Sequence, residues 1–231
     1  MKEQFSRTAM LLGDEGVGRL NAAHVAIFGL GGVGGYALEA LARAGVGAFT
    51  LCDNDVVSVS NINRQILALQ STVGQQKTKA AADRVRDINP EASVTVHQAF
   101  FLPETAEEFD FSSYDYVVDC VDTLAAKLEI YRRAREAGVP VISAMGAGNK
   151  LDATAFRVAD VHKTEGCALA RAVRNACRKA GIRDIKVVYS PETPTGTVIE
   201  ENGRHAPGSL SYVPSVMGLL MAGEVIKDLS K

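Results

Sequence analysis

A glycine-rich turn, Gly29-Leu30-Gly31-Gly32-Val33-Gly34, is the feature that most constrains the fold of this chain. It follows the apolar run at residues 24–28 and precedes a helical pattern that reaches residue 44. Gly29 and Gly31 permit a tight turn, and Gly34 permits close packing of the helix against a sheet. Such a turn sets a phosphate group at the N-terminus of the helix. The pattern therefore predicts a nucleotide site, although a tight turn that binds no ligand can have the same sequence pattern.

Strands and helices alternate through the rest of the first half. Strands are expected at residues 48–52, 93–97, 116–120 and 140–144, and helices at 77–88 and 124–136. This alternation is typical of a parallel sheet with right-handed crossovers. We predict an α/β fold with a Rossmann-type, mostly parallel sheet and helices on both faces.

The pattern changes after residue 148, where we expect antiparallel strands and further helices. A strand is predicted near 155–159, a basic helix at 167–180, a strand at 185–190 and an apolar helix at 209–229. Residues 193–208 are rich in Pro, Gly and Thr and predict a mobile loop. We expect one domain over 1–231, made of a nucleotide-binding half (1–150) and a substrate and dimer half (151–231).

Composition narrows the functional classes. The 231 residues carry a formal net charge of −2, so no global field attracts nucleic acid, although a local basic face remains compatible with it. The four cysteines are too few for a disulfide scaffold in a chain this long, which predicts a reduced, cytoplasmic protein. They include no Cys-x-x-Cys pair of the kind that binds zinc, so no zinc is expected. No N-terminal signal pattern is visible, and the apolar stretch at 213–223 is too short to span a membrane.

Charged residues after the second strand indicate which nucleotide is bound. Asp53 follows the glycine turn by about 20 residues, where an acid grips ribose hydroxyls in NAD and ATP alike. Arg64 and Lys77 favour ATP, because a triphosphate and a departing pyrophosphate need cations. Either cation alone could be a surface residue. Asp55 could hold a metal or cap a turn, and Asn61 could position the nucleotide or cap a turn.

Two carboxylates end the fourth strand, at the sheet edge where open α/β sheets bind ligands. Asp119 and Asp122 are both candidates for holding the Mg²⁺ that accompanies ATP. Asp122 lies beyond the strand and is the better metal candidate. It could instead cap the helix that begins near residue 124.

These motifs together resemble the ubiquitin-activating-enzyme-like adenylyltransferases, including those that activate molybdopterin and thiamine sulfur carriers. The resemblance covers residues 7 to about 145. It implies ATP and Mg²⁺ bound by the residues matching Asp53, Asn61, Arg64, Lys77 and Asp122. It also implies a homodimer in which Arg7 reaches the partner's site, and transfer of AMP to a carboxylate. The matching segments are Gly29-x-Gly31-Gly32-x-Gly34, Asp53-x-Asp55, Ser60-Asn61-x-Asn63-Arg64-Gln65, Gly74-x-x-Lys77, Ile88-Asn89-Pro90 and Asp119-Cys120-x-Asp122.

The second half is similar to the tRNA threonylcarbamoyladenosine dehydratases. That resemblance implies that ATP activates the carboxylate of threonylcarbamoyladenosine in tRNA, after which the base cyclises and AMP leaves. It leaves room for a sulfur-transfer partner and for a monovalent cation. The matching segments are Lys163-Thr164 to Arg174, Val187-Val188-Tyr189-Ser190-Pro191-Glu192 and Gly208-Ser209-Leu210-Ser211-Tyr212-Val213-Pro214.

Several alternatives stay open at this point. The chain could adenylate the Gly-Gly end of a ubiquitin-like sulfur carrier, could be an NAD-dependent oxidoreductase, or could be an inactive nucleotide-binding scaffold. Arg171, Arg174 and Arg178 share one helix face and could contact tRNA or simply be solvated. Cys167 could accept an acyl group but more often such a cysteine is a packing residue. Arg204 and His205 could close over a substrate.

Overall fold

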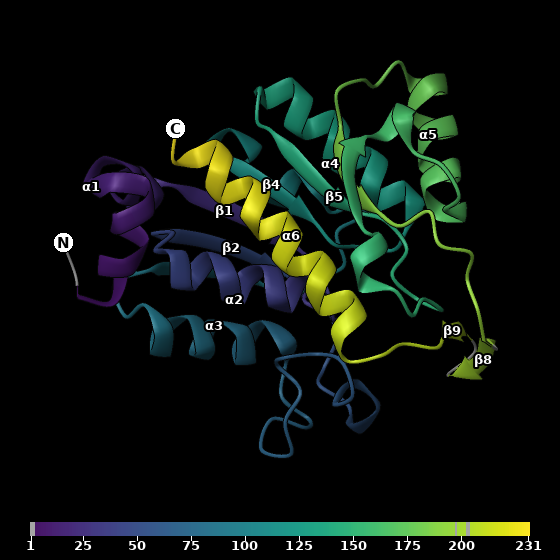
Figure 1. The fold of residues 1–231 in the computed structure, drawn as a ribbon, viewed down its shortest axis with the longest axis horizontal. Coiled ribbons are helices and arrows are strands. Elements are labelled where there is room, and N and C mark those ends of the chain that lie inside the picture. Colours follow the sequence, from purple (N-terminus) through teal and green to yellow (C-terminus); the bar gives the residue numbers. More distant parts are fainter. Residues whose placement is uncertain (1–2, 197, 202–203) are drawn as a thin grey trace.

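The computed structural model describes residues 3–196, 198–201 and 204–231, and its centre is one seven-stranded sheet (Figure 1). The strand order is β3-β2-β1-β4-β5-β7-β6. Neighbouring strands are parallel except at the β6–β7 edge, which is antiparallel. The strands are β1 (His24–Phe28), β2 (Ala48–Cys52), β3 (Ser93–His97), β4 (Tyr116–Asp119), β5 (Val141–Ala144), β6 (Arg157–Asp160) and β7 (Lys186–Tyr189).

Helices cover both faces of the sheet, as predicted. Side chains alternate along β1, so that Val25 and Ile27 join one core while Ala26 and Phe28 join the other. The first core packs against α1 (Ser6–Ala22), α2 (Gly34–Ala44), α3 (Lys77–Ile88) and α6 (Tyr212–Leu229), and the second against α4 (Leu124–Ala137) and α5 (Ala168–Ala180). Short 3-10 turns are η1 (Glu3–Phe5), η2 (Val59–Asn61), η3 (Ala106–Glu108), η4 (Phe111–Ser113), η5 (Ala153–Ala155) and η6 (Val161–Lys163).

The glycine turn between β1 and α2 needs glycine for steric reasons. Gly29 adopts φ 89°, a left-handed conformation that strains other residues. A Cβ atom on Gly34 would lie 1.9 Å from the carbonyl oxygen of Gly29. The close helix–sheet approach expected from the sequence is therefore present, and it brings the N-terminus of α2 to the carboxyl end of β1.

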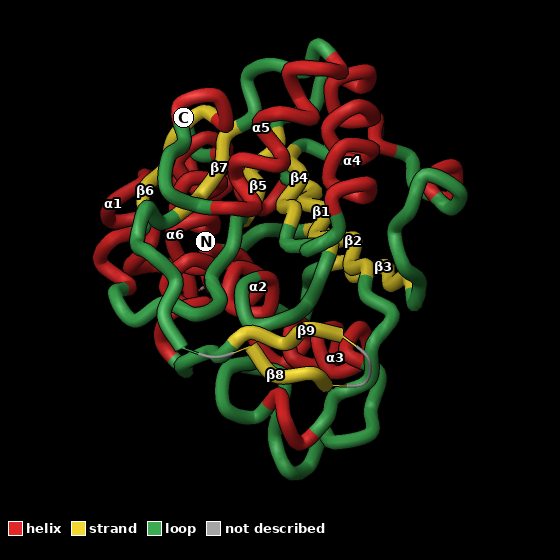
Figure 2. Tube along the Cα trace, turned by 90° about the vertical axis from the view of Figure 1, so that its right-hand side faces the viewer, coloured by secondary structure: helices red, strands yellow, loops and turns green. Residues whose placement is uncertain are grey.

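The C-terminal half departs from expectation in one place. The segment predicted as a mobile loop at 193–208 contains an antiparallel hairpin, β8 (Val198–Glu201) and β9 (Arg204–Pro207), which lies outside the main sheet (Figure 2). Asn149 ties both ends of this hairpin down. Its backbone oxygen accepts from Thr195 N (2.7 Å), and its side-chain Oδ1 accepts from Gly208 N (2.6 Å). The Pro, Gly and Thr residues of this segment indicated turns, but they did not indicate that β8 and β9 pair with each other.

The N-terminal arm packs at the edge of the sheet opposite the glycine turn. The Gln4 amide donates to Ile88 O at the end of α3 (3.4 Å), and the Phe5 ring lies against Gly45 at the end of α2. In a parallel sheet, α2 and α3 run back from the carboxyl edge to the amino edge, so the arm lies at the amino edge. No helix in the described part of the chain is long and apolar enough to cross a membrane.

Candidate nucleotide site

A cavity of about 640 Å³ opens at the carboxyl ends of β1, β2 and β4. This volume lies within the range of small-molecule and cofactor sites. The glycine turn, the 53–55 strand end and the start of α4 contribute to its lining. Of the residues singled out from the sequence, it gathers Gly29, Gly31, Asp53, Asp55, Lys77 and Asp122.

Asp53 organises the floor of this cavity. One carboxylate oxygen accepts from Leu30 N in the glycine turn (2.6 Å), and the other accepts from Asp55 N (2.8 Å). Lys77, only 4% exposed, places Nζ 2.7 Å from Asp55 Oδ2 and 4.0 Å from Asp53 Oδ1. The two carboxylates thus hold a largely buried cation beside the turn, where a phosphate chain would need it.

Arg64 and Asn61 lie on the loop that follows and do not line the cavity. Arg64 Nη1 donates to Ser60 O and to Asn63 Oδ1, both at 2.9 Å, although its own backbone packs against Gly32 of the turn. Asn61 Oδ1 accepts from Ser58 N (3.1 Å) and caps η2. The capping role that the sequence allowed for Asn61 is therefore present in this conformation.

Gln65 is a cavity residue to which sequence reasoning gave no role. Its side chain is 7% exposed, and Oε1 has no hydrogen-bond partner among the described residues. A buried unsatisfied amide is costly, so it is expected to find a partner when a polar ligand enters. Its place directly after Arg64 in the motif was the only signal in the sequence.

The two carboxylates of β4 have separate environments. Asp119 is fully buried; Oδ2 contacts Lys127 Nζ (2.9 Å) and Ser143 Oγ (2.6 Å), and Oδ1 accepts from Val121 N (3.1 Å). Asp122 is exposed and lines the cavity. Thr123, not Asp122, occupies the N-cap position of α4. Asp122 is thus the carboxylate available to a ligand, and Lys127 is an interior partner that the sequence did not reveal.

The fit of a magnesium ion rests on this donor set. No cluster of three or more His, Cys, Asp or Glu side chains that could hold a metal is present in the part of the chain that the structure describes. Mg²⁺ commonly uses one or two carboxylates together with phosphate oxygens and water. The exposed carboxylate of Asp122, whose Oδ1 accepts only a long hydrogen bond from Thr123 Oγ1 (3.3 Å) among the described residues, suits that mode.

Aromatic and thiol groups complete the walls. The segment after β3 contributes Phe100, which is 49% exposed and offers a flat surface that the sequence had not indicated. Burial and the nearby Asp53 raise the pKa of the Cys52 thiol to about 12. Desolvation and Asp119 also raise the pKa of the Cys120 thiol. These two cavity thiols therefore stay protonated at neutral pH.

Cys167 fits the packing interpretation. It is 5% exposed, and its Sγ accepts from Ala170 N (3.5 Å) at the start of α5. On the same helix, Arg171 and Arg178 are exposed, whereas Arg174 Nη1 donates to Thr164 O (2.6 Å) and Thr164 Oγ1 (2.7 Å). The three arginines predicted to act as one face are therefore not equivalent.

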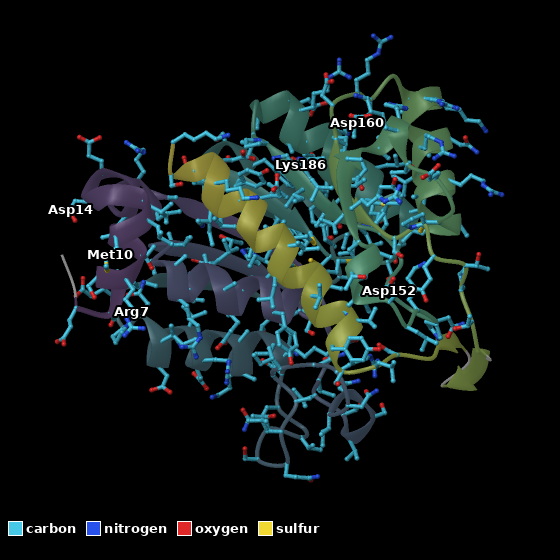
Figure 3. All side chains as sticks on the ribbon, viewed as in Figure 1. Arg7, Met10, Asp14, Asp152, Asp160 and Lys186 are labelled. Carbon is cyan, nitrogen blue, oxygen red and sulfur yellow. The ribbon has the colours of Figure 1, made fainter. Side chains whose placement is uncertain are left out.

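Arg7 lies far from the cavity of its own subunit. It is exposed on α1 at the amino edge of the sheet, and Figure 3 shows it at the end of the molecule near the N-terminus. The side chains of Arg204 and His205, on β9, lie outside the described part of the structure, as do residues 1–2, 197 and 202–203.

Comparison with known proteins agrees with this geometry. The model of the ThiF family matches residues 5–231. A Bacillus subtilis protein named tRNA threonylcarbamoyladenosine dehydratase is 42% identical over 100% of this chain and 96% of its own length. The crystal structure of the Escherichia coli tRNA N6-threonylcarbamoyladenosine dehydratase TcdA in complex with ATP superposes with a TM-score of 0.89. It is 33% identical and the match covers 98% of this chain and 93% of that one.

A more distant relative carries another name. The Aspergillus terreus "adenylyltransferase and sulfurtransferase uba4" is 34% identical over 95% of this chain but only 42% of its own length. Both kinds of relative fit the resemblance drawn from the motifs. With the family model covering almost the whole sequence, the chain belongs to the ThiF family.

Proposed function

We propose that this protein is an ATP-dependent dehydratase that activates the carboxylate of threonylcarbamoyladenosine in tRNA. The observation that carries the proposal is the cavity in which the glycine turn, the buried Lys77 and Gln65, whose Oε1 has no hydrogen-bond partner among the described residues, come together. The name of the Bacillus relative and the ATP complex of the Escherichia coli relative support the same assignment.

The chemistry follows from the charges in the cavity. A carboxylate oxygen of the substrate attacks the α-phosphorus of ATP, the bond to the β-phosphate breaks, and pyrophosphate leaves. A nitrogen of the same nucleoside then attacks the activated acyl carbon, and AMP departs with the former carboxylate oxygen. The net change in the base is the loss of one water. The second step is intramolecular, so proximity contributes to its rate and no enzyme nucleophile is required.

We assign roles to the chain's residues on this basis. The glycine turn with Gly29, Gly31, Gly32 and Gly34 holds phosphate, and Asp53 and Asp55 fix the turn and Lys77. Lys77 and a re-oriented Arg64 stabilise the negative charge of the transition state. Asn61 supports the loop that carries Arg64. Asp122 holds Mg²⁺, which supplies further neutralisation of the phosphates.

We further propose a homodimer in which Arg7 enters the partner's cavity. Two observations support this. Arg7 is at the sheet edge opposite its own cavity, and the neighbouring Met10 and Leu11 are 83% and 87% exposed (Figure 3). Residues 1–150 would supply the nucleotide site, and 151–231 the substrate and dimer contacts, in a cytoplasmic enzyme. A sulfur-transfer partner and a monovalent cation remain compatible additions.

The test is AMP release from ATP and Mg²⁺ with and without tRNA carrying threonylcarbamoyladenosine, followed by mass spectrometry of the nucleosides. We expect AMP only with that tRNA and a product lighter by one water. The matched control is Lys77→Ala, which should bind the tRNA but release no AMP.

The name of the Aspergillus relative favours a second candidate, activation of a ubiquitin-like carrier. No response to tRNA, but pyrophosphate exchange into ATP with a Gly-Gly carrier, would replace the proposal with that function.

A further inference from the structure

A second cleft, of about 450 Å³, lies between η6, the end of α5 and the loop that leads to β7. Its lining includes four basic side chains and two acidic ones. They are His162, Lys163, Arg178 and Arg183 with Asp160 and Asp184.

Helix α5 runs from the carboxyl end of β5, the strand next to β4, to the cleft. The helix begins beside the carboxyl end of β5, where a Cβ on Gly146 would lie 3.7 Å from Cys167 Sγ. It is 13 residues long, so its other end is about 20 Å away. Asp160, at the cleft, is on the upper side of the molecule in Figure 3.

The charge of this region is opposite to that of the rest of the chain. Eight lysines and arginines and three acids lie between Arg157 and Lys186, a formal charge of +5 in a chain whose total is −2. Most surface arginines elsewhere are neutralised; on the adjacent helix α4, Arg132 and Arg133 both pair with Glu129.

The cations of the cleft lack such partners. In the described part of the chain, Lys163, Arg178 and Arg183 are exposed and have no carboxylate within 4.0 Å. Asp160 is already engaged, because Oδ1 accepts from His162 N (2.7 Å) and caps η6. The unpaired positive charge therefore remains available to an anionic partner.

Arg174 gives the cleft its shape. Its two hydrogen bonds to Thr164 fasten the end of η6 to the middle of α5. Arg171 lies three residues before Arg174 and Arg178 lies four residues after it, on the same helix face. Both are exposed and extend the cationic surface along α5 towards the carboxyl end of β5.

We propose that this cleft binds the phosphodiester backbone of RNA, with Lys163, Arg178 and Arg183 as the phosphate contacts. An open, elongated cationic surface suits a continuous polyanion better than a single small anion, and the phosphate backbone is the usual target of unpaired Lys and Arg. The inference rests on the proposed function. The cleft would hold the RNA about 20 Å from the carboxyl end of β5, the strand next to β4, whose carboxyl end opens into the nucleotide cavity.

The test compares Arg178→Ala/Arg183→Ala with a control that loses two exposed cations from α3, Lys79→Ala/Arg86→Ala. Binding of unmodified and modified tRNA is measured at several salt concentrations, and ATP binding is measured alongside. We expect the cleft variant to weaken tRNA binding and to reduce the slope of log K against log salt by about two, roughly one per lost phosphate contact. Its ATP affinity and melting temperature should match those of the control.

Three results would overturn the inference. If the wild type dehydrates the modified tRNA and the cleft variant keeps the full salt slope, the cleft is not the RNA contact while the proposed function stands. If the wild type binds no tRNA at any salt concentration, both the RNA-binding role of the cleft and the proposed function are wrong. A third result, an equal loss in the control, would show that only total charge matters and would also count against the cleft.

Discussion

At the scale of single residues, Asp119 and Lys127 form an ion pair in the protein interior. Both side chains are fully buried, and Lys127 Nζ also donates to Ser143 Oγ (3.1 Å) and Ala144 O (2.8 Å). Lys127→Met should lower the free energy of unfolding by about 3–5 kcal/mol, because it leaves the Asp119 charge buried without its cationic partner. Urea denaturation measures this.

The double variant Asp119→Asn/Lys127→Met separates charge from packing. It removes both charges, so we expect it to recover most of the stability lost by the single variant. The side-chain oxygen of the introduced amide can still accept a hydrogen bond from Val121 N. This contact fixes the backbone of the residue directly before Asp122. KM for ATP should therefore change less in the double than in the single variant. Equal destabilisation of both variants would show that the buried charge is not the cause.

At the scale of elements, the α4 helix carries an ion-pair network whose strength depends on pH. Hydrogen bonds from Arg132 and Arg133 lower the pKa of Glu129 from 4.5 to about 2. Because the pKa is lowered by folding, the stabilisation is full above about pH 4.5 and is lost as the pH falls towards 2. Glu129→Gln should lower the free energy of unfolding by about 1 kcal/mol at pH 7, a small effect because Arg132 is nearly half exposed. The variant should also lose less of its remaining stability as the pH falls from 4.5 towards 2. The control is Glu136→Gln, and an unchanged loss of stability over this pH range in Glu129→Gln would contradict the assignment.

Elements were also where the sequence was most informative. Strands at 24–28, 48–52 and 93–97 and the helix at 77–88 were predicted to the residue. The first two are apolar runs that end at Gly29 and Asp53, the third alternates as a strand does, and the helical spacing of 77–88 stops at Asn89-Pro90. The β8–β9 hairpin was missed, since its pairing depends on contacts with Asn149 that are distant in sequence. In the cavity, the motif predicted Asp53, Lys77 and Asp122 together. Lys127 could not be found, because only the packed fold shows that its ammonium group turns inward.

At the scale of the whole molecule, the position of Arg7 is the main support for the proposed two-subunit site. The N-terminal arm and the cavity are at opposite edges of the same sheet, so one chain cannot bring them together without unfolding the arm. Arg7→Ala should therefore lose most AMP release while retaining tRNA binding. In a homodimer with the arginine acting in trans, Lys77 of one subunit and Arg7 of the other form each site.

Mixed dimers test this arrangement directly. Arg7→Ala and Lys77→Ala are each expected to be inactive alone, but a heterodimer of the two contains one site in which both residues are intact. Random assortment makes about half the dimers heterodimers, so activity should return to about a quarter of the wild-type value. Co-expression with two different tags allows the heterodimer to be purified and its mass checked by light scattering. The purified heterodimer should have about half the wild-type activity, because one of its two sites is intact, whereas a purified heterodimer without activity would show that Arg7 does not act in trans.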